Sequence, residues 1–114
     1  MTTPQTRLSP LEVRERAACM CEHGYACSSF APGHALHLIQ ARMASATPRG
    51  WVDALVAAAD PASGIVTLRT LDGDAITVWN AGGAALEAVA GTPVALHRDH
   101  DVLAIGAVQY NIAR

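Results

Sequence analysis

Apolar and polar positions follow two different periods along the chain, and the change comes near residue 50. Before it, apolar residues recur every three or four positions, which is typical of amphipathic helices. After it, apolar and polar residues alternate over short runs bounded by Gly, Pro and Asp, which indicates half-buried strands. We therefore expect an α+β protein, with an N-terminal helical hairpin followed by a small five-stranded β-barrel of the OB or SH3-like type.

The helical part is expected to begin after a disordered tail over residues 1–8. A Cys/His-rich helical hairpin then covers residues 9–47. Its first helix starts at Ser9-Pro10, since serine caps helices well and proline suits their first turn, and it ends at a glycine. The second helix is expected over residues 33–46 and ends before a proline.

The barrel part is expected over residues 51–114, in one compact domain with the hairpin. Turn signals such as Asp72-Gly73 separate its strands. The expected strands are Trp51–Ala58, Ile65–Leu71, Ala75–Trp79, Thr92–His97 and Val102–Gly106, with residues 108–112 as an extension of the fifth. Closure into a barrel suits so short a sheet because it removes the exposed edges.

The stretch from Gly64 to Gly106 resembles the barrel of the small hydrogenase-maturation chaperones. Those barrels also end in a Gly-x-x-Val-x-x-His strand, which here runs from Gly91 to His97. The resemblance implies the barrel fold alone. The Met-Cys start that defines those chaperones is absent, so no residue role is carried over from them.

Composition narrows the functional classes. The 114 residues are 51% hydrophobic, which is enough for one core, and no apolar run is long enough to span a bilayer. The start of the chain lacks the pattern of a signal peptide, so we expect a cytoplasmic protein without membrane contact. The net charge is −2, and residues 51–114 carry three Arg against seven acidic residues. An acidic barrel is unsuited to phosphate backbones, so nucleic acid is not an expected partner.

The densest candidate chemistry is a group of cysteines and histidines in the hairpin. Cys19 and His23 are four residues apart and share a helix face. Cys21 lies about 200° away from Cys19 around the helix, so we place it in the core. Thiolate and imidazole are the ligands that zinc prefers. The predicted metal ligands, with zinc as the candidate ion, are Cys19, His23, Cys27, His34 and His37.

Other interpretations of the polar and aromatic residues stay open. The cysteines are small hydrophobes of a purely structural hairpin, or Cys19 and Cys27 form a redox pair. Residues 97–101, His-Arg-Asp-His-Asp, form either a charged turn or a metal or proton-transfer group. Trp51 and Trp79 are core residues or a stacking platform for bases.

The resulting hypothesis is a small, non-catalytic metal-binding accessory protein. The hairpin holds the ion, and the barrel binds a protein partner or a second copy. The alternative is a metal-free structural or interaction subunit of a larger assembly, which docks through its alanine-rich helices. An enzyme is the least supported class, because the sequence has no nucleophile elbow, phosphate loop or dinucleotide fingerprint.

Overall fold

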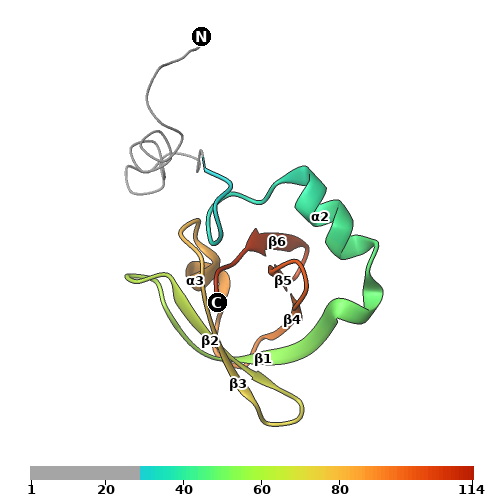
Figure 1. Cartoon of the computed structure of the whole chain (residues 1–114). Helices are drawn as coiled ribbons and strands as arrows, with labels where there is room; N and C mark the ends of the chain where they lie inside the picture. Colours follow the sequence, from blue (N-terminus) through green and yellow to red (C-terminus); the bar gives the residue numbers. More distant parts are fainter. Residues whose placement is uncertain (1–28) are drawn as a thin grey trace.

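The computed structural model describes residues 29–114, which form an antiparallel sheet that curls around its own core (Figure 1). The strand order is β3-β2-β1-β4-β5-β6. The strands are β1 Trp51–Asp60, β2 Ile65–Thr70, β3 Ala75–Trp79, β4 Pro93–His97, β5 Val102–Ile105 and β6 Val108–Asn111. Within these residues, the helical segments are α2 Leu38–Ser45, the short 3-10 helix η2 Pro48–Gly50 and α3 Ala84–Glu87.

The core lies inside the curl and is built by strand alternation. In β2, for example, Val66, Leu68 and Thr70 are buried while Ile65 and Arg69 are exposed. Helix α3 closes one end of this core with buried alanines. The buried cluster is Ala54, Val56, Val66, Leu68, Val78, Ala84, Ala85, Ala88, Val94, Leu96, Leu103, Ile105 and Ile112.

The two edge strands meet at a single point. Trp79, the last residue of β3, forms an isolated antiparallel bridge with Ala113, just after β6. The amide of each residue donates to the carbonyl of the other, at 2.8 and 2.9 Å. A single bridge between short strands is a weak closure, so further contacts are needed to hold this end together.

Asn80 supplies one set of these contacts. Its side chain is 3% exposed, and all of its hydrogen-bonding capacity is used. Nδ2 donates to the carbonyls of Gly33 and Asn111, at 3.1 and 2.7 Å. Oδ1 accepts from the amides of Gly82 and Ala84, at 2.8 and 3.1 Å. Asn80 therefore joins the end of β3 to the end of β6, to the start of α3 and to the segment before α2.

Asn111 supplies the second set, from the other edge strand. It is also 3% exposed. Its Nδ2 donates to the carbonyls of Ala31 and Ala35, both at 3.0 Å. Its Oδ1 accepts from Gln40 Nε2 at 3.1 Å and from the amide of Gly33 at 3.4 Å. We call the two residues the asparagine clamp, since together they fasten residues 30–35 across the ends of both edge strands.

The predicted five-stranded closed barrel is wrong in two respects. The sheet has six strands, because the chain reverses at Gly106, which has a φ of +61°, and β6 pairs with β5 as a strand of its own. The sheet is also a curled half-barrel rather than an OB or SH3-like barrel, because β3 and β6 meet only at the Trp79–Ala113 bridge.

The predicted helical hairpin is not present in residues 29–114. The expected tail and first helix lie outside the described residues. The second helix, expected over residues 33–46, is confined to Leu38–Ser45, with His37 as its N-cap. Gly33 has a φ of +88°, and the carbonyls of Ala31 and Ala35 are bonded to Asn111, so this stretch cannot be helical.

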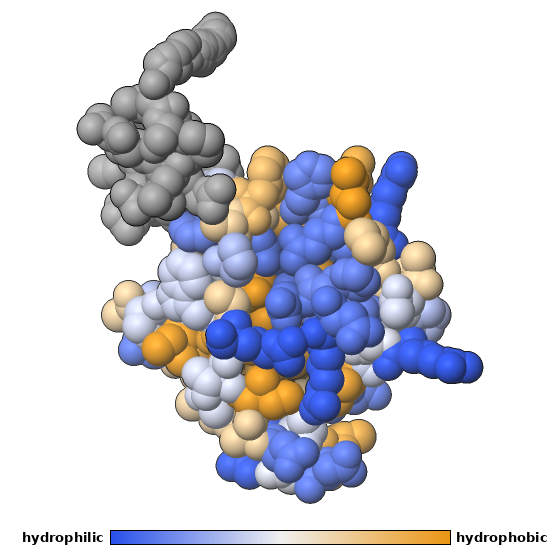
Figure 2. Space-filling view, in the orientation of Figure 1, coloured by the Kyte–Doolittle hydropathy of each residue, from blue (hydrophilic) through white to orange (hydrophobic). Residues whose placement is uncertain are grey.

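Several large apolar side chains reach the surface. On the face drawn in Figure 2, hydrophobic residues emerge in separate groups among hydrophilic ones, and one group lies along the upper rim, where Figure 1 places α2. In α2 itself, Leu38, Ile39 and Met43 are exposed while Ala44 is buried. No helix among the described residues is both long and apolar enough to cross a membrane.

The asparagine clamp gives a first prediction. We expect Asn111→Ala to lower the free energy of unfolding by about 2–4 kcal/mol, because it removes the donor that Ala31 and Ala35 share and leaves the carbonyl of Ala31 with the amide of His34 alone. Urea unfolding measures the loss. Gln109→Ala, on the same strand, is the control and should cost less than about 0.5 kcal/mol. Equal costs for the two variants would contradict the clamp.

Tyr110 on β6 gives a second prediction. Burial, and then the negative charge of Glu87 on α3, raise the pKa of its phenol above the ordinary 10.0. The folded protein thus favours the neutral phenol, so this contribution to stability is present below about pH 10 and is lost as the pH rises through the folded pKa.

Glu87→Gln should lower the pKa of Tyr110, because it removes the charge but leaves the burial unchanged. Phenolate absorbance measures this in a Tyr25→Phe background, where Tyr110 is the one remaining tyrosine. Asp74→Asn, at the β2–β3 turn, serves as the control and should leave the titration where it is. A Tyr110 titration that Glu87→Gln does not move would contradict an electrostatic interaction between Glu87 and Tyr110.

Candidate binding pocket beside Trp79

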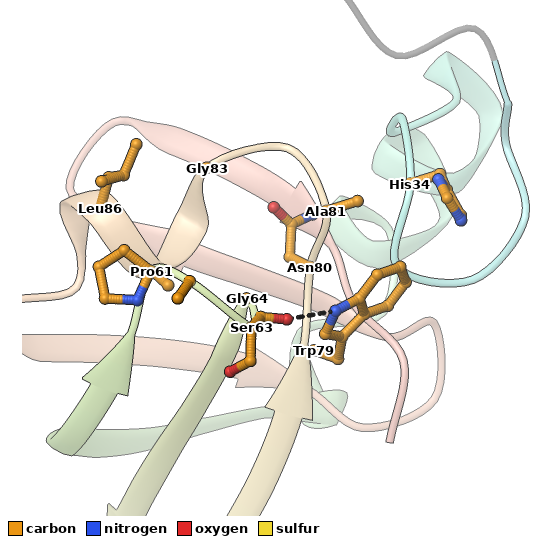
Figure 3. Close-up of a pocket in the computed structure, with 11 residues that line it drawn as sticks. His34, Pro61, Ser63, Gly64, Trp79, Asn80, Ala81, Gly83 and Leu86 are labelled. Atoms are coloured by element: carbon orange, nitrogen blue, oxygen red, sulfur yellow. Dashed lines mark hydrogen bonds between the residues drawn. The ribbon is translucent and has the colours of Figure 1, made fainter. Parts of the chain in front are cut away.

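A pocket of about 300 Å³ opens next to the asparagine clamp, where the chain leaves β3 (Figure 3). The turn between β1 and β2 forms one wall, the segment after β3 forms another, and α3 and His34 complete the lining. The lining residues are His34, Pro61, Ala62, Ser63, Gly64, Trp79, Asn80, Ala81, Gly83, Ala85 and Leu86.

The indole of Trp79 is the largest wall of this pocket. It is held in place by Nε1, which donates to the carbonyl of Ser63 at 2.8 Å (Figure 3). The His34 ring meets the indole edge to face, with ring centroids 5.2 Å apart. On the sheet, Trp79 pairs with Ile65 across β2 and β3. The indole is therefore held by one hydrogen bond and one ring contact before any ligand arrives.

A glycine makes this close packing possible. The Cα of Gly33 lies against the indole of Trp79, and a Cβ at this position would collide with the ring. Gly33 also has a φ of +88°, which L side chains rarely adopt. The segment before α2 can therefore approach Trp79 only because residue 33 has no side chain.

The polar groups of the pocket are already engaged with one another. Both ends of the Asn80 amide are bonded within the clamp. The hydroxyl of Ser63 lies 3.0 Å from the carboxylate of Asp60, to which it donates. In the described part of the chain, no buried side-chain nitrogen or oxygen lacks a hydrogen-bond partner. A ligand in this pocket thus meets more apolar than polar surface, chiefly Trp79, Pro61 and Leu86, and this favours an apolar group.

The predicted metal ligands do not come together in the described residues. Cys19, His23 and Cys27 lie outside them. His34 packs on Trp79, whereas His37 caps α2, its Nδ1 accepting from the amide of Ile39 at 3.0 Å.

Residues 29–114 contain no group of three or more His, Cys, Asp or Glu side chains that could hold a metal ion. The expectation of a metal-binding helical hairpin is therefore contradicted for the described residues, whereas zinc as the ion, with Cys19, His23 and Cys27 among its ligands, stays a prediction. The two histidines assigned to it have structural contacts instead: one belongs to the pocket wall, and the other to a helix cap.

The second polar group, at residues 97–101, is structural. His97 is fully buried, and its Nδ1 accepts from the amide of His100 at 3.2 Å. Nε2 therefore carries the proton and donates to the carbonyl of Thr47 at 2.8 Å. The ring of Trp51 packs edge to face on the same imidazole. His97 thus ties the β4–β5 turn to the segment before η2, and both ring nitrogens are used.

The same turn borders another hollow, of about 310 Å³, near Gln40. The Gln40 side chain spans it and donates to the carbonyl of His100 at 2.8 Å. Asp101, on its rim, is paired with Arg114 at 3.0 Å. The amide and this carboxylate are therefore both engaged within the protein.

Sequence reasoning did not find the Trp79 pocket. The available signal was the run Trp79-Asn80-Ala81-Gly82-Gly83 at the end of a strand, where an aromatic residue is followed by an amide and two glycines. Comparisons with known protein families, with curated proteins and with solved structures found no match to this chain. The pocket is therefore interpreted from its own geometry.

A pair of glycine variants tests the packing of the pocket wall. Gly33→Ala should lower the free energy of unfolding by about 2–4 kcal/mol, because the new Cβ adds a collision with Trp79 to the backbone strain. Gly73→Ala is the matched control, with a φ of +95° and nothing within 4 Å of a Cβ, and should cost about 1 kcal/mol. Urea unfolding compares the two variants. Equal costs would mean that residues 30–35 do not pack on Trp79 as described.

Proposed function

We propose that this chain is a non-catalytic interaction module, which binds a protein partner by accepting one apolar side chain of that partner beside Trp79. This corresponds to the metal-free alternative raised by the sequence. The observation that carries the proposal is the pocket itself, in which a fixed indole forms a wall and the polar groups are bonded internally. Such a site selects for shape and apolar surface rather than for charge.

The rim of the pocket favours a protein over a small free ligand. Leu86 lines the pocket and is 69% exposed, and Pro61, also in the lining, is exposed as well. A small molecule in the pocket would leave most of this apolar rim in water. A protein surface covers the pocket and rim together, which places a buried apolar anchor at the centre of the contact.

The side chains around the pocket do not favour catalysis. General acid–base chemistry needs a proton donor and acceptor within hydrogen-bond reach of a common reacting atom. His34 is the single titratable residue in the lining of this pocket, and its ring packs on Trp79. The acidic excess of residues 51–114 argues in addition for a partner other than nucleic acid.

A displayed library of short random peptides provides the probe for this function. Peptides selected on the wild-type chain should share an apolar anchor residue. Leu86→Glu should weaken the selected peptides at least about tenfold, because a carboxylate at the rim must be desolvated. Binding is followed by the fluorescence of Trp79 in a Trp51→Phe background, which leaves one tryptophan.

Leu38→Glu on α2 is the matched control. Leu38 is 67% exposed and Leu86 is 69% exposed, and both belong to helices, so the chemical change is the same at a different surface. The control should bind the peptides as the wild type does. If both variants bind equally, or if Leu38→Glu alone loses binding, the partner docks on another surface and the proposal for the pocket is wrong.

A further inference from the structure

Helix α2 turns its larger apolar side chains toward solvent. At 100° per residue, Leu38, Arg42, Ile39 and Met43 fall within about 140° of one another around the helix. All four are exposed, whereas the opposite side presents Ala44, which is buried. A surface helix usually has the reverse arrangement, with its large apolar residues toward the core. The outward side of α2 is therefore an apolar surface that no described element covers.

Phe30 extends this surface at the start of the helix. Its ring meets that of His37, the N-cap of α2, edge to face, with ring centroids 4.8 Å apart. Together with Leu38, Ile39 and Met43, it makes four large apolar side chains that are each between 48% and 67% exposed. We call these four side chains and Arg42 the α2 face. Exposed apolar groups gathered in this way mark a surface that binds another molecule.

The charges of the chain place a positive end at the α2 face. Residues 29–50 contain Arg42 and Arg49 and no acidic residue. Residues 51–96 contain one arginine against five acidic residues. Two of these acids, Asp72 and Asp74, lie at the tip of the β2–β3 hairpin, which projects on the side away from α2 in Figure 1. Positive charge thus coincides with the exposed apolar side chains.

The turn between β4 and β5 does not cancel this charge. It lies beside α2, because the Gln40 side chain donates to its backbone. Its Asp101 is already paired with Arg114. The other two charged residues of the turn, Arg98 and Asp99, have opposite signs. The surroundings of the α2 face therefore keep the positive charge of the helix and of the segment that follows it.

We propose that the α2 face binds the surface of an anionic lipid bilayer, with the helix lying among the headgroups. The apolar side chains enter the boundary of the acyl chains, and Arg42 and Arg49 meet the headgroup phosphates. Arg42 fits among apolar side chains in this setting, because its carbon stem stays in the apolar layer while the guanidinium reaches the phosphates. Figure 2 shows apolar groups along a rim of the molecule, which suits a soft plane.

A second copy is a poorer occupant of the same face. A twofold axis across α2 sets Arg42 of one copy against Arg42 of the other, near the centre of the contact. Like charges that face each other disfavour association. An anionic bilayer meets the same guanidinium with the opposite charge.

The proposal replaces the expectation that the chain has no membrane contact. That expectation rested on the lack of a signal peptide and of a run long enough to span a bilayer, and binding at the interface needs neither. The α2 face is separate from the Trp79 pocket, so the proposal does not depend on the proposed function.

Flotation of the full chain with lipid vesicles tests this binding. Vesicles of phosphatidylcholine with about 30% phosphatidylglycerol should bind the chain at least about tenfold more tightly than phosphatidylcholine alone, because two arginines meet anionic headgroups. Raising the salt from about 0.05 M to about 0.5 M should release most of the bound chain, since these charges are exposed. Absence of binding to either kind of vesicle, or equal binding to both, would overturn the proposal.

Two glutamate variants locate the binding surface. Leu38→Glu should lower vesicle binding at least about tenfold, because the new carboxylate must be desolvated and is repelled by the headgroups. Leu86→Glu adds the same charge beside the Trp79 pocket and should bind vesicles as the wild type does. The selected peptides should show the opposite pattern, so failure of this proposal is distinguishable from failure of the proposed function. Vesicle binding that Leu38→Glu leaves unchanged would mean that another surface meets the bilayer.

A pair of arginine variants tests the role of charge. Arg42→Gln should weaken binding to the anionic vesicles about fivefold. Arg69→Gln, at an exposed position of β2, changes the net charge equally and should leave binding unchanged. Equal losses in the two variants would contradict a specific role of the α2 face. Sedimentation without vesicles checks the other occupant: if the wild type self-associates and Leu38→Glu does not, a second copy covers the α2 face and the proposal is wrong.

Discussion

The structure depends on two buried amides. A sheet of six short strands that curls without closing has two edges to bring together, and here the strands supply one bridge between them. Asn80 and Asn111 supply the rest, with donors for loop carbonyls and acceptors for loop amides. Apolar side chains could fill the same volume, but they would remove the partner of backbone groups such as the amides of Gly82 and Ala84, and an unpaired buried group costs about 1–3 kcal/mol. The clamp thus provides hydrogen-bond partners for the backbone groups of the loops.

The pocket is a consequence of this clamp. By bonding to Gly33, Asn80 draws the segment before α2 over Trp79, and by bonding to Ala84 it sets the start of α3 on the other side. The space left between these elements is the pocket. The amide groups that shape the pocket are already hydrogen-bonded to the backbone. The surface of the pocket is therefore more apolar than polar. The same interaction therefore explains both the position of the site and its apolar character.

The sequence predicted the strands well, because alternation reports directly on the two faces of a sheet. It did not predict that β6 is a separate strand, since Gly106 and one further residue suffice for the reversal. The predicted second helix also began too early, at residue 33. Helical periodicity does not reveal that Asn111, far along the chain, donates to the carbonyls of Ala31 and Ala35. The errors thus arise where long-range hydrogen bonds override a local pattern.

The two predicted ligands within the described residues have other contacts for a related reason. Histidines near cysteines suggest a metal, but a histidine is also an aromatic ring and a helix cap, and the structure uses His34 and His37 in these ways. Trp79 could be recognised from the sequence as important, though not as a pocket wall, because its partners Ser63, His34 and Gly33 come from separate parts of the chain. Where an incomplete curl is fastened at one end, the groups that fasten it create a pocket at that end. Among the described residues, the pocket therefore follows from a sheet whose two edge strands share a single bridge.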